Sequence, residues 1–325
     1  MPIHRLSDFA SLSPHLRGGV VAIGNFDGVH RGHQIVLEKA LELASALSKP
    51  AIVLTFEPHP RTAFQPDQPV FRLTPPRLKA EILSAMGFNA VIEQTFTRDF
   101  ASISADDFVH EILVGGLGAE HIVTGFDFHF GKNRQGGPAF LMAAGAREGF
   151  KVTLVDAFRD ESGSVVSSSR IRDCLAESDA AAAASLLGYR YLVEAPVIEG
   201  KKLGRTLGYP TANMQLAPET RLAHGIYAVR FRRADGTIRD GVASFGRRPT
   251  VISNGAPLLE TFVFDFDGDL YGETCAVSFF GFLRPELKFS GLDALMVQMK
   301  RDEEEARALL SGVRPISGLD VNVSF

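Results

Sequence analysis

Apolar and polar positions in the first half of the chain alternate between two spacings. An unbroken apolar run, GVVAIG at 19–24, is followed by a polar turn and then by QIVLEKALELASALS at 34–48, in which apolar residues recur every three or four positions. A second apolar run, AIVLTF, occupies 51–56. The short runs predict strands and the recurring spacing predicts a helix. Strand, helix and strand in this order indicate a βαβ unit of a parallel sheet.

The same alternation continues along the first half through the segments 78–87, 90–96, 106–118, 121–126, 140–149 and 151–158. It predicts a doubly wound, Rossmann-like α/β domain. An alanine-rich stretch, DAAAAASLLG at 179–188, favours a helix ending on Gly188 as its C-cap, and the pattern changes there. We therefore expect two domains, 1–183 and 184–325.

Beyond Tyr189 the segments become short and rich in β-forming residues, and turn signals such as ADG and DGD separate them. They lie at 189–198, 225–233, 237–245, 258–266 and 274–283, and a helical pattern follows at 292–310. This half predicts a small antiparallel β-barrel closed by a C-terminal helix. The sequence contains no internal repeat.

Composition narrows the class of protein. The 325 residues are 45% hydrophobic, enough for two cores, and the net charge of −4 gives no basic excess for a nucleic-acid backbone. The two cysteines, Cys174 and Cys275, suggest neither a disulfide framework nor a zinc site. The N-terminus lacks the apolar run of an export signal, and no stretch is long and apolar enough to span a membrane. We expect a soluble cytoplasmic protein whose partners are neither nucleic acid nor membrane. A homo-oligomer is compatible with the sequence.

The segment GNFDGVHRGH at 24–33 lies where the first predicted strand passes into the first predicted helix. Ligands of open α/β sheets bind at the carboxyl ends of strands, and a helix N-terminus offers N–H groups to phosphate. His30 and His33 can donate hydrogen bonds to phosphate oxygens there and stabilise charge that develops during displacement at phosphorus. A capped helix with two surface histidines, or half of a metal site, are the alternatives.

This segment resembles the nucleotidyltransferase form of the H-x-G-H signature, in the spelling of bacterial FAD synthetases. Three further stretches agree with that family in order and interval: TFEPHP at 55–60, GFDFHFGKNRQG at 125–136 and VSSSRIR at 166–172. The resemblance implies an FMN adenylyltransferase with charge stabilisation by His30, His33 and Arg172. The nucleotide and phosphate ligands that it implies in this half are Gly24, Asn25, Phe26, Gly28, Ser167, Ser168 and Ser169.

The residue types fit these roles. The serine hydroxyls can donate hydrogen bonds to a triphosphate, and the planar, positively charged guanidinium of Arg172 can bind it as well. Phe56 and Pro58 can form an apolar wall for a planar ring. Asp127 is expected to lie with Phe56 and Pro58 on the flavin side of the site. The serines can equally cap a helix that starts near Arg170, and the two roles are compatible.

Two nucleotide-binding motifs are excluded. Gly125 and the Gly131-Lys132 pair are spaced one residue too far apart for a P-loop, and Asn133 stands where the P-loop requires Ser or Thr. The first strand is not followed by G-x-G-x-x-G, which argues against a nicotinamide-type dinucleotide fold.

The second informative segment is EGKKLGRTLGYPTANM at 199–214. Gly200, Gly204 and Gly208 allow a loop to bring backbone N–H groups close to phosphates. Thr211 and Asn213, two residues apart, present oxygens on one face if the chain is extended, and such oxygens suit Mg²⁺. A glycine-rich hairpin followed by an ordinary turn is the alternative for the glycine run.

The segment resembles the riboflavin kinase signature nearly letter for letter, and HGIYAV, GVASFGRRPT, LLETFVFDFDGDLYG and FFGFLRPELKF follow in the order of that family. By position, the resemblance makes Glu260 the general base and Arg205 a phosphate ligand. Arg284 is a candidate for the flavin or nucleotide pocket, or else an exposed loop arginine. At four positions the residue differs from the one usual in the family, although no proposed ligand is lost: Ser169, Ala195, Ser244 and Phe262.

Together, the two resemblances imply a bifunctional enzyme of flavin cofactor synthesis. Riboflavin and ATP give FMN in the C-terminal half, FMN and a second ATP give FAD and pyrophosphate in the N-terminal half, and Mg²⁺ serves both. One alternative is a nucleotidyltransferase for another phosphorylated acceptor, such as pantetheine phosphate or nicotinamide mononucleotide. Another is a flavin-sensing module with one inactive half.

Overall fold

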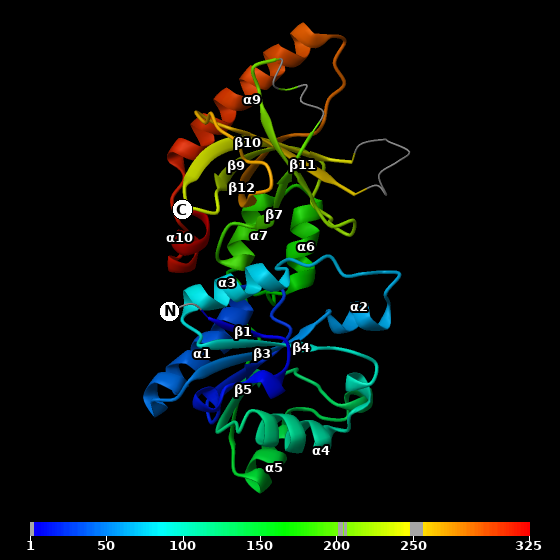
Figure 1. Ribbon diagram of the computed structural model, residues 1–325, viewed down its shortest axis with the longest axis vertical. Helices are drawn as coiled ribbons and strands as arrows, with labels where there is room; N and C mark the ends of the chain where they lie inside the picture. Colours follow the sequence, from blue (N-terminus) through cyan, green and yellow to red (C-terminus); the bar gives the residue numbers. More distant parts are fainter. Residues whose placement is uncertain (1–2, 201–203, 205–206, 248–255) are drawn as a thin grey trace. The chain divides into compact units, whose positions relative to one another are not determined.

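The computed structural model describes residues 3–200, 204, 207–247 and 256–325 of the chain (Figure 1). They form two compact units, residues 1–167 and 168–325. The predicted boundary between residues 183 and 184 lies further along the chain. The helices α6 (Ser168–Ala176) and α7 (Ala180–Leu187) therefore belong to the second unit, whereas the predicted boundary leaves α6 in the first domain and divides α7.

A parallel six-stranded sheet forms the centre of the first unit, with the strand order β1-β4-β3-β2-β5-β6. The strands are β1 (His4–Leu6), β2 (Val20–Ile23), β3 (Ala51–Glu57), β4 (Ala90–Thr95), β5 (His121–Gly125) and β6 (Lys151–Val155). All but β1 follow the predicted apolar runs. The three residues of β1 at the sheet edge are too few to give a recognisable pattern.

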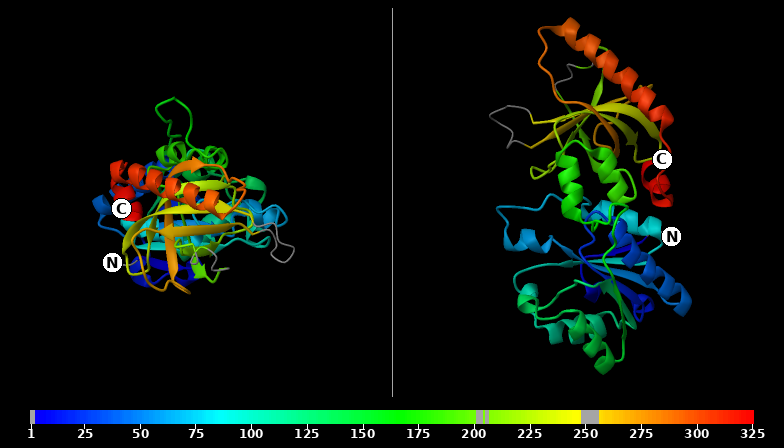
Figure 2. Two further views of the ribbon diagram at one scale, coloured as in Figure 1. Left: turned by 90° about the horizontal axis from the view of Figure 1, so that it is seen from above. Right: turned by 180° about the vertical axis from the view of Figure 1, so that it is seen from behind.

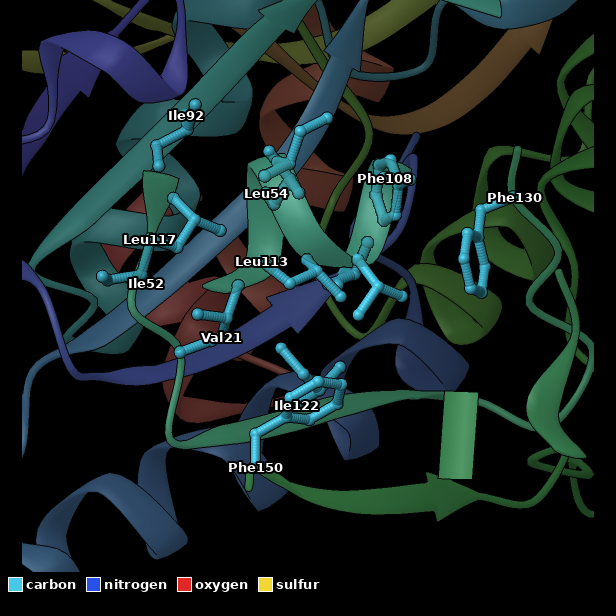
Figure 3. Packing of buried hydrophobic residues seen from close by; sticks show 14 of the residues in the cluster. Val21, Ile52, Leu54, Ile92, Phe108, Leu113, Leu117, Ile122, Phe130 and Phe150 are labelled. Atoms are coloured by element: carbon cyan, nitrogen blue, oxygen red, sulfur yellow. The ribbon is translucent and has the colours of Figure 1, made fainter. Parts of the chain in front are cut away.

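Helices cover both faces of this sheet. They are α1 (Arg31–Leu47), α2 (Pro60–Phe64), α3 (Pro76–Met86), α4 (Ala105–Asp107), the π-helical η4 (Phe108–Gly116) and α5 (Pro138–Glu148), with single 3₁₀ turns η1 (Phe9–Ser11), η2 (Pro14–Leu16), η3 (Phe100–Ser102) and η5 (Lys132–Arg134). One face packs against η4 and α5, where Ile52, Leu54 and Ile122 of the strands contact Phe108 and Leu113 (Figure 3). On the other face α1 contacts β2 and β5, and α3 contacts β4.

The strand order reverses at β2. The chain runs from β2 to β3 on one side, and β5 later pairs with β2 on the other side. In parallel sheets the carboxyl ends of the strands share one edge, and the reversal leaves a crevice there. The three family-like stretches that begin at 24, 55 and 125 lie at the carboxyl ends of β2, β3 and β5. The fold therefore brings them to the same edge.

The second unit begins with α6 and α7 and continues as a closed barrel of antiparallel strands in the order β10-β11-β8-β7-β12-β9. Its strands are β7 (Leu192–Ile198), β8 (Thr211–Gln215), β9 (Gly225–Arg232), β10 (Ile238–Gly246), β11 (Leu258–Val263) and β12 (Thr274–Arg284). Two helices follow, α9 (Leu292–Gly312) and α10 (Gly318–Ser324).

Helix α9 lies along the outside of the barrel (Figure 2) and contacts β9, β10 and β12. Its residues Ala306 and Leu310 pack with Phe264 and Phe280. The predicted architecture, a parallel α/β domain followed by an antiparallel barrel with a C-terminal helix, is thus confirmed. No helix in the described ranges has the length and apolar character needed to cross a membrane.

Candidate active sites

The segment Gly24–His30 forms a tight loop between β2 and α1, which we call the signature loop. Three of its residues have positive φ: Phe26 at 47°, Gly28 at 90° and Val29 at 37°. Such values are unusual for residues that carry a side chain, so the surrounding structure must hold the loop in this shape. Gly24 N–H donates to the Leu54 carbonyl at 3.2 Å, which ties the start of the loop to β3.

The two histidines lie together at the start of α1. His30 is the N-cap, and its Nδ1 accepts a hydrogen bond from the His33 backbone N–H at 3.3 Å. The rings stack with centroids 3.6 Å apart and planes 15° apart. Phe26 is buried and packs edge-on against His33 at 5.4 Å, so its ring supports the histidine. The predicted pairing of His30 and His33 at a helix N-terminus is therefore what the structure contains.

Electrostatics favour a neutral His33. Burial lowers the pKa of this imidazole well below 6.5, and the neighbouring His30 and Lys79 lower it further. Its Nδ1 is buried and finds no hydrogen-bond partner among the described residues. A neutral imidazole beside the positive end of the α1 dipole can gain a proton when an anion approaches.

A buried lysine lies beneath the signature loop. Lys79 of α3 is fully buried, and its Nζ donates to the Asn25 carbonyl at 3.0 Å, Thr55 Oγ1 at 2.9 Å and Glu57 Oε1 at 2.9 Å. Thr55 Oγ1 itself donates to the Asn25 carbonyl at 3.1 Å. The side-chain Oδ1 of Asn25 is also buried and accepts no hydrogen bond from any described residue.

Arg72 and Asp27 continue this network. Arg72 donates to both carboxylate oxygens of Glu57, at 2.6 and 2.7 Å, and its Nε lies 3.3 Å from Asp27 Oδ1. Asp27 Oδ1 also accepts the backbone N–H groups of Leu73 and Thr74 at 3.0 and 3.1 Å. Burial acts to raise the pKa of Glu57, but hydrogen bonds and charge from Arg72 and Lys79 outweigh it and lower that pKa. Glu57 is thus a carboxylate held between two cations.

Sequence reasoning missed Lys79, Arg72, Asp27 and Glu57. A signal for Lys79 was present, because it falls on the apolar face of its helix with Leu78, Ile82 and Leu83. A charged residue in an apolar stripe requires a partner. The partner lies on another element, so the spacing could not identify it.

The segment after β3 holds the residues predicted for the flavin. Phe56 is buried, 7% exposed, and packs against Phe96 and Phe100. Pro58 is exposed and follows a cis peptide bond from Glu57. The nearby aromatic ring that faces solvent is Phe64 of α2, 55% exposed and packed edge-on against Phe96. Phe64 is therefore a candidate that the motif did not reveal.

Asp127 lies just beyond β5 at the same edge of the sheet. Its side chain is exposed, and its backbone carbonyl lies 2.8 Å from His129 Nδ1. Phe126, which precedes it, is 48% exposed. The edge thus combines an exposed carboxylate with exposed aromatic rings on two of its loops.

The serine run lies where the two units meet along the chain. Ser167 is the last residue of the first unit, and Ser168 and Ser169 open α6 in the second, two residues before the predicted helix start. Arg172 follows one turn later on the same helix. The first N–H groups of a helix lack intrahelical partners, which is compatible with both the capping role and the phosphate role.

The barrel brings together three of the residues predicted for the second site. Glu260 of β11 lies directly opposite Asn213 of β8, and Phe262 lies opposite Thr211. Residues two apart on a strand share a face, so Thr211, Asn213 and Glu260 project from one side of the sheet. Ser244 of β10 is the partner of Glu260 on its other side, so one of the four departures adjoins the predicted base.

Asn213 is the most constrained member of this group. It is 5% exposed, and its Nδ2 donates to the Thr211 carbonyl at 3.1 Å. Its Oδ1 is buried without a hydrogen-bond partner in the described part of the chain. Gly200 packs so closely here that a Cβ atom at residue 200 would lie 2.6 Å from Asn213 Nδ2. The extended conformation on which the Thr211 and Asn213 prediction depended is confirmed.

Gly204 and Gly208 lie in the part of the predicted loop that the structure describes. The carbonyl of Gly204 accepts the N–H groups of Leu207 and Tyr209 at 3.0 and 2.8 Å, and Gly208 has a φ of 82°. Arg205 lies outside the described residues. The ring of Tyr209 packs edge-on against Phe262 at 4.8 Å.

Arg284 ends β12 and is engaged within the barrel unit. Its guanidinium binds both carboxylate oxygens of Asp302, a buried residue of α9, and its Nη1 donates to the Pro285 carbonyl at 3.0 Å. Its side chain is only 16% exposed, so the alternative of an exposed loop arginine is wrong. The pair joins α9 to the barrel, and a flavin contact by Arg284 stays a prediction.

Comparisons with known proteins agree with two separate activities. The chain matches the family model described as FAD synthetase over residues 12–170 and the one described as riboflavin kinase over residues 187–310. It is 42% identical to the bifunctional riboflavin kinase/FMN adenylyltransferase of Pseudomonas fluorescens, with 92% of this chain and 95% of that protein covered. It is 37% identical to the Escherichia coli K12 protein of the same name, with 96% and 98% covered.

A solved structure is similar over nearly the whole chain. It belongs to a Streptococcus pneumoniae protein described as a macrolide-efflux protein, with a TM-score of 0.82 and 30% identity, covering 94% of this chain and 99% of that one. Both units of the fold therefore occur together in another protein.

Proposed function

Because the chain belongs to the bifunctional riboflavin kinase/FMN adenylyltransferase family, we propose that its barrel unit makes FMN and its parallel-sheet unit converts FMN to FAD. The observation that supports this division most directly is the separation of two polar groups. His30 and His33 lie at the start of α1 in the first unit, and Asn213 and Glu260 lie on paired strands of the second.

In the parallel-sheet unit, a phosphate oxygen of FMN attacks the α-phosphorus of ATP, a new P–O–P bond forms, and the bond to the β-phosphate breaks to release pyrophosphate. The nucleophile is already anionic at neutral pH, so no general base is required. His30 and His33 donate hydrogen bonds to phosphate oxygens. Arg172, which lies on α6, is proposed from the sequence resemblance alone to add a fixed positive charge. Groups that act on charge developing in the transition state contribute more than those that bind the ground state.

The lowered pKa of His33 fits this role. A neutral imidazole avoids an unpaired positive charge in a partly buried site before the nucleotide arrives. The phosphate charge then raises the proton affinity of the ring, which strengthens its hydrogen bond as negative charge accumulates. Gly24, Asn25, Gly28 and Ser167 complete the phosphate side of the first unit in this proposal, and buried Phe26 contributes by supporting His33. Ser168 and Ser169 of α6 are proposed as phosphate ligands from the sequence resemblance alone.

In the barrel unit, Glu260 accepts the proton of the terminal ribityl hydroxyl of riboflavin while that oxygen bonds to the γ-phosphorus of a separate ATP and ADP leaves. Phosphoryl transfer depends mainly on positioning and charge neutralisation, so one base on a rigid strand is sufficient. The backbone at Gly200, Gly204 and Gly208, with Arg205, is proposed to approach the ATP phosphates. ADP and FMN are the products of this half.

The residues around Glu260 fit a bound Mg²⁺. Thr211 and Asn213 supply neutral oxygens, and the buried Oδ1 of Asn213 lacks a partner among described residues, which is costly unless a ligand satisfies it. We assign both residues as ligands. When bound, Mg²⁺ would neutralise phosphate charge.

For the flavin in the first unit, we propose the sheet edge formed by Phe56, Pro58 and Asp127. Exposed Phe64 and Phe126 extend it and are better placed than buried Phe56 to contact a planar ring directly. In the second unit, Arg284 stays a proposed flavin contact that would act from its fixed position beside Asp302.

We propose that the two activities divide between residues 183 and 184, where the sequence pattern places the domain boundary. It falls between the two matched ranges, although α6 and α7 fold with the barrel. Because both steps consume ATP, we also propose a cytoplasmic location.

The test is to incubate the purified chain with ATP and Mg²⁺ plus either riboflavin or FMN, and to separate the flavins by chromatography. Riboflavin should give FMN and then FAD, and added FMN should give FAD directly. Failure to form FMN or FAD would refute the proposal. Parallel incubations with pantetheine phosphate and nicotinamide mononucleotide check for another acceptor, and faster conversion of either than of FMN would also refute it.

A further inference from the structure

Lys79 is a charged residue in a position where an apolar one would normally lie. It is fully buried on the sheet-facing side of α3, next to Leu78, Ile82 and Leu83. Burial lowers its pKa, an effect that the nearby Glu57 carboxylate opposes. A buried charge is retained only where hydrogen bonds and an opposite charge compensate for lost hydration.

The geometry compensates Lys79 fully. An ammonium group has three N–H donors, and Nζ has three acceptors, at 2.9–3.0 Å: the Asn25 carbonyl, Thr55 Oγ1 and Glu57 Oε1. Two of these acceptors belong to the end of β3 and the third to the signature loop. One side chain therefore joins α3, β3 and the loop.

The loop is held from both sides by this network. Lys79 and Thr55 bind the carbonyl of Asn25, while Asp27 is bound by Arg72 and by the N–H groups of residues 73 and 74. Gly28 N–H donates to Thr74 Oγ1 at 2.8 Å. These contacts surround Phe26, whose positive φ and edge-on contact with His33 depend on the path of the loop.

We propose that Lys79 is a positioning residue for adenylyl transfer, which fixes the signature loop so that His30 and His33 meet the reacting phosphates. It does not touch the reacting atoms. Through Glu57, the residue before Pro58, it also fixes the start of the proposed flavin edge, and so sets the nucleotide and flavin sides relative to each other. The inference rests on the proposed FMN adenylyltransferase activity.

The deciding experiment uses the full chain with Lys79→Met, which keeps an unbranched side chain and removes the charge and all three hydrogen bonds. We expect kcat for conversion of FMN to FAD to fall by about 10- to 100-fold, since a shift of about 1 Å in a reacting group has an effect of that size. The KM values for FMN and ATP should change by less than about threefold, because the binding groups themselves remain.

Riboflavin phosphorylation serves as an internal control, because it is assigned to the other compact unit and should keep its wild-type rate. Lys49→Met is the matched variant. It makes the same substitution in the first unit, where Lys49 forms a half-exposed ion pair with Glu120, and it should leave both activities unchanged. Thermal unfolding of each variant, followed by circular dichroism, reports whether the first unit is folded.

A folded Lys79→Met protein with wild-type kcat for FAD formation overturns the inference, as does a loss confined to KM. If Lys79→Met does not fold, Thr55→Val decides, because it has nearly the same shape and removes only the hydroxyl between Lys79 and Asn25. It should lower kcat for FAD formation at least threefold without changing riboflavin phosphorylation, and an unchanged kcat overturns the inference. A wild-type chain that makes no FAD instead refutes the proposed function.

Discussion

Replacing Glu260 with glutamine tests the kinase assignment at its proposed base. Glutamine keeps the size of the side chain and its place opposite Asn213 and Ser244, so the strand pairing should be undisturbed. Cross-strand neighbours have Cβ atoms roughly 4.5–5.5 Å apart. The carboxylate therefore lies close to the side chain of Asn213, and in Glu260→Gln the amide would occupy the same space without accepting the proton.

The expected size of the effect follows from how the reaction is catalysed. Removing a general base commonly costs about 10²- to 10⁴-fold in rate. Phosphoryl transfer relies mostly on positioning, which Glu260→Gln preserves. We therefore expect the lower end, about 10²-fold in kcat, equivalent to about 2.7 kcal/mol of transition-state stabilisation.

The assay must allow for the second activity, which consumes FMN. With riboflavin as substrate, the summed appearance of FMN and FAD gives the kinase rate, and with FMN as substrate the appearance of FAD gives the transferase rate. Glu260→Gln should lower only the first. Glu305→Gln, on the exposed side of α9, controls for the loss of one negative charge and should lower neither. Riboflavin phosphorylation within about threefold of wild type, or an equal loss of both activities, would refute the role of Glu260.

Three further predictions concern His33 and Asn213. His33→Ala should slow FAD formation by about 10²-fold, the usual effect of losing one transition-state donor, while FMN still accumulates from riboflavin. The stability of the first unit should depend on His33 in acid. Because the pKa of this ring is lowered in the folded protein, the unfolded chain binds a proton more readily than the folded chain does. The free energy of unfolding is therefore unaffected by this ring above about pH 6.5, and it decreases as the pH falls from there toward the pKa of the folded state. Urea unfolding of wild type between pH 7.5 and 5 should show this loss, and His33→Leu should show a smaller one. Asn213→Ala should raise the Mg²⁺ concentration for half-maximal riboflavin phosphorylation by about tenfold or more without affecting FAD formation; an unchanged Mg²⁺ requirement would exclude it as a ligand.

The order of elements was largely predictable because each half of the chain has one dominant periodicity. The buried strands of the first unit appear as apolar runs, and the barrel strands other than β8, which begins within the glycine-rich segment 199–214, appear as short segments between turns. The prediction failed where an element is short or held by distant contacts. The strand β1 has three residues, and α10, which the pattern missed, is held by buried Asp320, whose carboxylate binds the backbone N–H and side chain of Arg190 across 130 residues.

The candidate sites were predictable to the extent that their residues are adjacent in sequence. His30 and His33 share one turn of helix, and Thr211 and Asn213 share one strand face, so spacing alone gave their relations. The support beneath the signature loop was not predictable. Lys79, Arg72, Glu57 and Asp27 come from four separate segments, and only the folded sheet brings them together. The burial of Phe56 and the pairing of Arg284 with Asp302 likewise depend on tertiary packing.

The pairing of β8 with β11 also limits how this barrel can evolve. Alternate residues of β8 face opposite sides, with Ala212 and Met214 buried between the two proposed ligands and beyond them. A one-residue insertion or deletion within the strand would turn the ligands inward and the apolar residues outward, and would remove Asn213 from its place opposite Glu260. Homologous chains should therefore vary more in the length of the loop after β8 than within the strand, and should keep a constant spacing from Thr211 to Asn213. Change at this site must come through substitution, as at Ser244, and not through insertion or deletion.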